Sequence, residues 1–286
     1  FVDRVGRMVQ RDIHHASVVM WSLGNESGAG TNHEAAAAFA RSFDPSRPLH
    51  YEGGIRGNWS GSHSLTDVIA PMYPNISAIK EYAKSPKADR PLIMCEYSHA
   101  MGNSNGTLAE YWEVIESTPG LQGGFIWEMW DHGPVQTLPD GSKRNAYGGD
   151  YGETKHDGNF CCDGMVFPDR TAKPAMHEFK AIAAPAVVTG VKGSAGQFKI
   201  FNKNFFKDLS EYQLQWSITC DGIVQDSGVV KLPKVAPRKT ANFKVSSKKL
   251  AKGTNRGERF ITFSLVCVES TPWALPMSEI GWSQVA

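Results

Sequence analysis

The stretch VVMWSLGNESG at residues 18–28 begins like a strand and ends in small and polar residues. Its first half is apolar and partly β-branched, which is typical of a strand covered on both faces. Its second half carries one carboxylate, Glu26, just after the apolar run ends. A charged side chain at the end of a rigid strand predicts a functional site, and the rest of the sequence indicates which kind.

Length and charge limit the classes of function. The 286 residues are enough for one large or two ordinary domains with a substantial core. Lys and Arg number 30 and Asp and Glu 29, so the formal charge is +1. That balance gives no electrostatic reason to expect a nucleic acid or an anionic membrane as partner. No apolar run approaches the ~20 residues that span a bilayer.

The first residue and the cysteines predict a cellular context. The sequence begins with Phe1 and shows no secretion leader, so we expect a piece of a longer, cytoplasmic protein. The five cysteines form no C-x-x-C metal pattern, and their odd number favours reduced thiols. A disulfide between Cys220 and Cys267, which both lie in strand-like runs, is the less favoured alternative.

Residues 1–180 alternate strand-like and helical patterns. Helices are predicted for RVGRMVQRDI, NHEAAAAFARSF, ISAIKEYAKS and TLAEYWEVIES, and Asp44-Pro45 should end the second. Besides the run at Val18, strands are predicted for PLHYEGG, DVIAPMYP, PLIMCEYSHAMGN and GGFIWEMWDH. Such alternation predicts a parallel sheet with helical crossovers.

Reactive side chains lie where these apolar runs end: Glu26, Glu52, Tyr73, Glu96 with His99, and Trp127. In a (β/α)₈ barrel, the active site is assembled from the carboxyl ends of the strands. Because loops are polar in general, one or two such residues would mean little, but five strand ends favour a barrel site.

From about residue 184 the pattern becomes an alternation of period two, interrupted by Asp-Gly and Ser-Gly turns. This pattern predicts an antiparallel β-sandwich over residues 184–286. The basic stretch AKGTNRGE at residues 251–258, with Lys244, Lys248 and Lys249 nearby, is expected to be a solvated turn rather than a binding patch.

Glu26 and Glu96 are 70 residues apart. A barrel uses roughly 25 residues per βα unit, so the two fall on strands n and n+3 and can face each other across the mouth. Facing carboxylates at a sugar-sized gap carry out glycoside hydrolysis, one as a proton donor and the other ionised. Spacing alone leaves this function and a pair of structural salt-bridge acids equally open.

Seven blocks resemble those of the family-two glycoside hydrolases, in particular the large bacterial β-galactosidases. They are WSLGNESGAGTNHE, DPSRPLHYEGG, APMYP, RPLIMCEYSHAMGNS, LQGGFIWEMWDH, AYGGDYGE and CDGMVFPDR. The resemblance covers nearly all of residues 1–180 and continues less specifically beyond them. It implies an α/β plus all-β chain: about strands 4 to 8 of a (β/α)₈ TIM barrel, followed by an immunoglobulin-like β-sandwich.

The resemblance also implies a retaining exo-β-galactosidase that releases terminal β-D-galactose, for example from lactose, by double displacement. Glu26 would be the general acid/base and Glu96 the nucleophile. The implied substrate contacts are Asn25 with the sugar 2-hydroxyl, Tyr73 with the nucleophile, His99 near the 6-hydroxyl, and Trp127 as the platform under the galactose.

Two cations follow from the same resemblance. Glu26 would bind Mg²⁺, and Phe160, through its carbonyl, would bind Na⁺ together with Asp163. The family usually has Asn at the position of Asp163, so the charge of the sodium site would differ here. The parent protein is expected to be a homo-oligomer whose partner is a β-galactoside, with no nucleic acid or membrane.

Alternatives remain within the family and outside it. β-Glucuronidase or β-mannosidase activity is the nearest, and a non-catalytic carbohydrate-binding fragment is the other. Glu52, Glu128, His14 and His15 are interpreted as structural, while Asp131 and Asp150 stay open, with a cap or loop hydrogen bond as the default. Since five barrel strands leave open parallel edges, we expect the isolated chain to be unstable or to aggregate.

Overall fold

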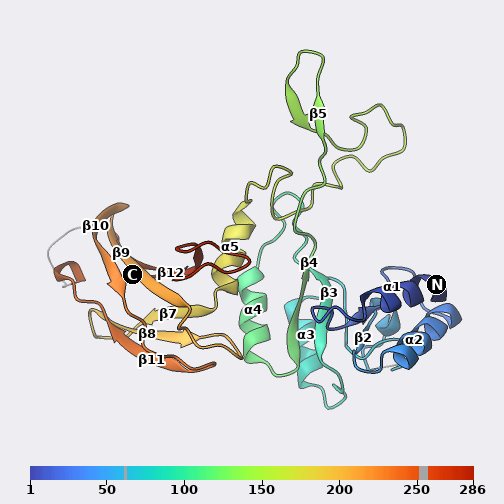
Figure 1. Ribbon diagram of the computed structural model, residues 1–286, viewed down its shortest axis with the longest axis horizontal. Coiled ribbons are helices and arrows are strands. Elements are labelled where there is room, and N and C mark those ends of the chain that lie inside the picture. The colour runs from blue at the N-terminus through green and yellow to red at the C-terminus, as the bar shows by residue number, and fades with distance from the viewer. Residues whose placement is uncertain (61–62, 251–256) are drawn as a thin grey trace. The chain divides into compact units, whose positions relative to one another are not determined.

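A computed structural model gives the structure of the chain and describes all residues except 61–62 and 251–256 (Figure 1). The chain divides into two compact units, Phe1–Met176 and His177–Ala286. Helix α5, Pro174–Ala183, crosses the boundary between them. Most of the predicted basic turn at residues 251–258 lies outside the described residues.

The four predicted helices of the first unit form where their patterns place them: α1 Val2–Asp12, α2 Thr31–Phe43, α3 Ile76–Lys84 and α4 Leu108–Ser117. Asn75 begins α3 by accepting a hydrogen bond from the Ala78 N–H at 2.8 Å, the usual role of an N-cap. The apolar face of α1 and the alanines of α2 share a core cluster with Trp21.

Five segments of this unit run parallel, in chain order. The strands are β1 Trp21–Ser22, β2 Leu49–His50, β3 Leu92–Tyr97 and β4 Leu121–Ile126, and residues 67–73 lie between β2 and β3. β1 pairs with β2 and β3 pairs with β4. Residues 67–73 join the pairs through the Asp67 N–H to the Leu49 carbonyl and through a parallel bridge between Ile69 and Leu92. The carboxyl ends of all five therefore lie at one edge of the sheet.

Two predicted strands are shorter than expected. Val18 donates its N–H to the His15 carbonyl in a turn, and Val19 is 72% exposed, so the ladder begins only at Trp21. The run DVIAPMYP forms isolated bridges rather than a continuous strand, because Pro71 has no N–H to donate to its neighbour.

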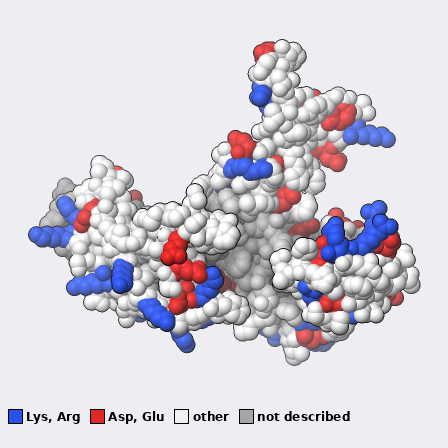
Figure 2. Space-filling model, in the orientation of Figure 1, with Lys and Arg blue, Asp and Glu red and all other residues white. Residues whose placement is uncertain are grey.

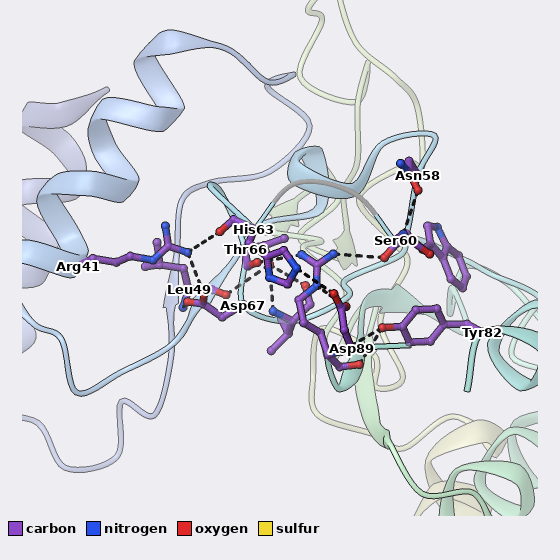
Figure 3. Close-up of polar contacts among 12 residues, drawn as sticks. Arg41, Leu49, Asn58, Ser60, His63, Thr66, Asp67, Tyr82 and Asp89 are labelled. Carbon is purple, nitrogen blue, oxygen red and sulfur yellow. Dashed lines mark hydrogen bonds and ion pairs between the residues drawn. The ribbon is translucent and has the colours of Figure 1, made fainter. Parts of the chain in front are cut away.

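The connection after β2 contains no α-helix among its described residues, and a polar network holds it instead (Figure 3). The Asp67 carboxylate accepts hydrogen bonds from the Arg41 guanidinium at 2.9 Å and from the Leu49 N–H at 2.7 Å. The buried Arg90 donates to the Thr66 carbonyl at 3.1 Å. This network lies at the amino ends of the strands, opposite the edge that collects the reactive side chains.

Outside residues 251–256, the regular structure of the second unit is all β apart from α5 and a short 3₁₀ turn, η2 Lys248–Leu250. One sheet has the order β10-β9-β12-β13 and the other β11-β8-β7, all antiparallel. The strands are β7 Ala186–Gly190, β8 Gln197–Asn202, β9 Tyr212–Cys220, β10 Ile223–Val230, β11 Thr240–Lys244, β12 Arg259–Cys267 and β13 Glu279–Val285.

Side chains of both sheets form one core in this unit. The rings of Phe198 on β8 and Phe263 on β12 meet edge to face with centroids 4.8 Å apart. All five cysteines of the chain are free. The alternative of a Cys220–Cys267 bridge is wrong, because Cys220 pairs with Arg259 and Cys267 with Tyr212 at opposite ends of the β9–β12 ladder.

Acidic and basic side chains are both present on each unit in the face drawn in Figure 2, in keeping with the formal charge of +1. A short hairpin, β5 Val135–Thr137 and β6 Lys143–Asn145, belongs to the first unit. Among the described residues, none of the helices combines the length and apolar character that a membrane span requires.

Phe263 tests the sandwich core. It is 1% exposed, so we expect Phe263→Ala to lower the free energy of unfolding of the second unit by about 3–5 kcal/mol, as for other buried aromatic truncations. Native-state hydrogen exchange of β9 and β12 measures this loss. Phe206→Ala is the matched control, because Phe206 is 96% exposed and its loss should change stability by less than about 0.5 kcal/mol. Equal effects of the two variants would contradict the assigned core.

Candidate active site

Glu96 lies near the carboxyl end of β3 and is bonded to Tyr73 on the neighbouring segment. The Tyr73 hydroxyl donates to Glu96 Oε2 at 2.8 Å, and the Tyr73 N–H donates to the Glu96 carbonyl at 2.9 Å. Burial, and then the Glu96 carboxylate, raise the pKa of the Tyr73 phenol. Tyr73 therefore stays protonated and serves as a hydrogen-bond donor to the carboxylate.

An open cavity of about 560 Å³ brings together residues from several strand ends. Asn25, after β1, Glu96, on β3, and Trp127, after β4, all line it. His50 and Phe125 line the same cavity, with ring centroids 6.1 Å apart. A hollow of this size, with a carboxylate and an indole on its wall, suits a small polar ligand that has one apolar face.

Glu26 is exposed and lines a second cavity, of about 220 Å³, together with Glu52 and Trp59. Its backbone is left-handed, with φ of 50°, a conformation that costs a non-glycine residue on the order of 1–3 kcal/mol. Its N–H donates to the Glu52 carboxylate. This contact agrees with the interpretation of Glu52 as structural, although the sequence pattern did not reveal its partner.

Asp163 connects the remaining predicted residues. Its Oδ2 accepts a hydrogen bond from the Trp127 indole N–H at 2.9 Å and lies 4.0 Å from His99 Nε2. The His99 ring is 5.9 Å from that of Phe160. Asp163 is 3% exposed, and its Oδ1 is buried without a hydrogen-bond partner. An unsatisfied buried carboxylate oxygen fits a cation ligand, since such groups are otherwise costly.

A second carboxyl group lies beside Asp163. Burial, and then the neighbouring Asp163 carboxyl group, raise the pKa of Glu128 to about 7. Glu128 also approaches His132, with 3.3 Å between Oε1 and Nε2.

The two aspartates that the sequence left open have structural partners. Asp131 is buried and accepts from the Lys173 ammonium at 2.8 Å and the Gly164 N–H at 2.7 Å. Asp150 accepts from the Tyr147 N–H at 2.9 Å and lies 2.8 Å from the Arg144 guanidinium. The default of a loop hydrogen bond therefore holds for both aspartates, and each also forms an ion pair.

The described part of the chain supports the expected Mg²⁺ at Glu26 less than it supports a cation at Asp163. No group of three or more His, Cys, Asp or Glu side chains is placed there to hold a metal. Among the described residues, Glu26 alone does not form a magnesium site.

Cys95 lines the same cavity as Glu96 and is the competing nucleophile. Burial, and then the charges of Glu96 and Glu52, raise the pKa of its thiol to about 12, so the thiolate is scarce at neutral pH. We expect iodoacetamide at about pH 8 to modify native Cys95 about 30-fold or more slowly than the same residue in urea, measured by mass spectrometry. Equal rates in the native and unfolded protein would restore Cys95 as a candidate.

The chain matches known proteins along most of its length. Residues 1–187 match "Glycosyl hydrolases family 2, TIM barrel domain" and residues 198–286 match "Beta-galactosidase, domain 4". The chain is 37% identical to "Beta-galactosidase 2" of Enterobacter cloacae, over 99% of this chain and 28% of that protein. It is 36% identical to a "Beta-galactosidase" of Pectobacterium atrosepticum over the same shares.

The chain thus spans about 28% of the length of these curated relatives. The first match covers more than half of the chain and includes the whole parallel sheet with the cavities at its carboxyl edge. The chain therefore belongs to family 2 of the glycosyl hydrolases.

Proposed function

We propose that the protein containing this chain is a retaining exo-β-galactosidase that acts on terminal β-D-galactose. The observation that carries the proposal is Glu96, on the wall of an open cavity, accepting a 2.8 Å hydrogen bond from Tyr73. Membership of the family and the 36–37% identity to proteins named β-galactosidase support galactose as the sugar.

The mechanism assigns different tasks to the two carboxylates. Glu26 gives its proton to the glycosidic oxygen while Glu96 attacks the anomeric carbon, which forms a galactosyl-enzyme. Glu26 then takes a proton from water, and the water oxygen displaces Glu96. Because each step inverts the anomeric carbon, the released galactose keeps its configuration. In a retaining enzyme the two carboxyl groups are ~5–5.5 Å apart.

Other residues orient the sugar and the nucleophile. Asn25 forms a hydrogen bond with the sugar 2-hydroxyl, and such hydrogen bonds strengthen in the transition state. His99 lies near the 6-hydroxyl of the sugar. The Trp127 indole, held by Asp163, forms the platform under the pyranose. The protonated Tyr73 hydroxyl stabilises the Glu96 carboxylate as it leaves the galactosyl group.

The cations belong to the same proposal. Asp163, through its unpartnered Oδ1, and the Phe160 carbonyl would hold Na⁺, whose positive charge attracts sugar hydroxyl groups. Mg²⁺ at Glu26 would need further ligands besides the described residues.

The remaining parts of the proposal concern the whole protein. They are a TIM barrel followed by an immunoglobulin-like sandwich, a homo-oligomeric parent and a cytoplasmic location. Two antiparallel sheets with a common core support the sandwich, and five free cysteines fit a reducing compartment.

Glu96 gives the direct test of the nucleophile. In the intact protein we expect Glu96→Gln to lower kcat for p-nitrophenyl β-D-galactoside by about 10³-fold or more, because the amide cannot form the galactosyl-enzyme. Proton NMR of the wild-type reaction should show β-galactose as the first product. Preference for aryl β-glucuronides or β-mannosides, or a first product with the α configuration, would contradict the proposal.

Chemical rescue distinguishes the proposed role of Glu26 from that of Glu96. We expect Glu26→Gly to lose about 10²–10⁴-fold in rate on substrates with poor leaving groups. Azide should restore turnover and give β-galactosyl azide, because the small anion occupies the space of the lost carboxylate. An α-galactosyl azide would instead assign the nucleophile's role to Glu26.

A further inference from the structure

Glu26 needs an external restraint, because nothing in its own conformation favours its position. It lies beyond the end of β1, its side chain is exposed, and its backbone is left-handed with φ of 50°. A proton donor has to be held within hydrogen-bond reach of the oxygen that it protonates. An exposed residue in a strained backbone conformation does not meet that requirement unaided.

Glu52 supplies the restraint. It is the first residue of the 3₁₀ turn η1, Glu52–Ile55, which follows β2. Its Oε1 accepts the backbone N–H of Glu26, across 26 positions of sequence. A hydrogen bond to an ionised carboxylate is stronger than one between neutral groups, and it fixes the peptide from which the Glu26 side chain projects.

Neighbours of Glu52 hold the next residues of the same loop. The buried Tyr51 hydroxyl donates to the Gly28 carbonyl at 2.5 Å and lies 2.9 Å from Ser27 Oγ. A Cβ on Gly53 would come within 2.5 Å of the Gly28 carbonyl oxygen, so the two segments are in close backbone contact. Residues 51–53 therefore clamp residues 26–28, and Glu52 is the part of the clamp that reaches Glu26.

We propose that Glu52 is a positioning residue for Glu26, an inference that rests on the proposed acid/base role of Glu26. The two residues line one cavity of about 220 Å³, so the restraint acts at the surface from which Glu26 projects and not in the core. A misplacement of about 1 Å can cost about 10²-fold in rate. Loss of Glu52 should therefore weaken proton donation specifically.

The leaving group distinguishes this role from a structural one. Protonation matters most for poor leaving groups such as phenol and least for 2,4-dinitrophenol. In the intact protein, we expect Glu52→Ala to lower kcat/KM for phenyl β-D-galactoside by about 10–100-fold, and for the 2,4-dinitrophenyl galactoside by less than about 3-fold. Glu52→Gln retains an acceptor oxygen and should stay within about 5-fold of wild type on both.

Asp67→Asn is the matched control, because Asp67 anchors the same connection at the amino ends of the strands (Figure 3), whereas Glu26 follows the carboxyl end of β1. Any loss in Asp67→Asn should be uniform across leaving groups. A uniform loss in Glu52→Ala as well, or no loss, overturns the inference. If Glu52→Ala does not fold, Glu52→Asp, which shortens the reach by one methylene, should give the same leaving-group dependence, and a uniform loss there overturns it.

Hydrogen exchange gives a readout independent of activity. The Glu26 amide should exchange about 10-fold or more faster in Glu52→Ala than in wild type or Asp67→Asn, because its acceptor is lost. Unchanged exchange overturns the inference even if the enzyme is active. If wild type hydrolyses no galactoside, the proposed function fails, and faster exchange still supports Glu52 as the restraint on Glu26.

Discussion

The parallel hydrogen-bond ladder of the first unit is the constraint on which the site depends. In this ladder the Asp67 N–H donates to the Leu49 carbonyl and the Tyr73 N–H to the Glu96 carbonyl. Because the paired segments run parallel, their carboxyl ends lie at one edge. A shift of one residue in this pairing would separate Tyr73 from Glu96, because the ladder decides which residues of neighbouring segments lie side by side. Tyr73 donates two hydrogen bonds to Glu96: its hydroxyl to the Glu96 side chain and its backbone N–H to the Glu96 carbonyl.

The two carboxylates are held in different ways. Glu96 lies within a strand, so the ladder that builds the sheet also positions the proposed nucleophile. Glu26 lies on a loop in a strained conformation and depends on contacts from residues 51–53. This difference fits the proposed chemistry: the nucleophile must approach one carbon along a fixed line, and the acid/base must serve two oxygen atoms in succession.

The sequence predicted the local features well. Asp44-Pro45 ended α2 where expected, because proline lacks the N–H that the helix would need, and Asn75 began α3 as a cap. It overestimated the strand at Val18, because β-branched residues favour strands in general while the actual pairing depends on the segment at Pro48. Of the side chains predicted at strand ends, Glu26, Glu52, Glu96 and Trp127 line the two cavities, and Tyr73 and His99 line neither.

The hydrophobic pattern of the sequence does not predict contacts between residues that are far apart along the chain. Periodicity says nothing about a carboxylate such as that of Glu52, which accepts a hydrogen bond from a peptide N–H 26 residues away. The same applies to Asp131, whose partner Lys173 is 42 residues distant, and to the unpartnered Oδ1 of Asp163. Such contacts are fixed by how the segments pack, and only the three-dimensional structure reveals them.

The central claim is that Glu96 forms the covalent bond to galactose. The most direct measurement is to inactivate the intact protein with 2,4-dinitrophenyl 2-deoxy-2-fluoro-β-D-galactoside and locate the label by peptide mass spectrometry. The fluorine slows both steps and the good leaving group favours the first, so the galactosyl-enzyme accumulates. We expect the label on Glu96. A label on Glu26, Cys95 or any other residue, or turnover with no labelled peptide, would contradict it.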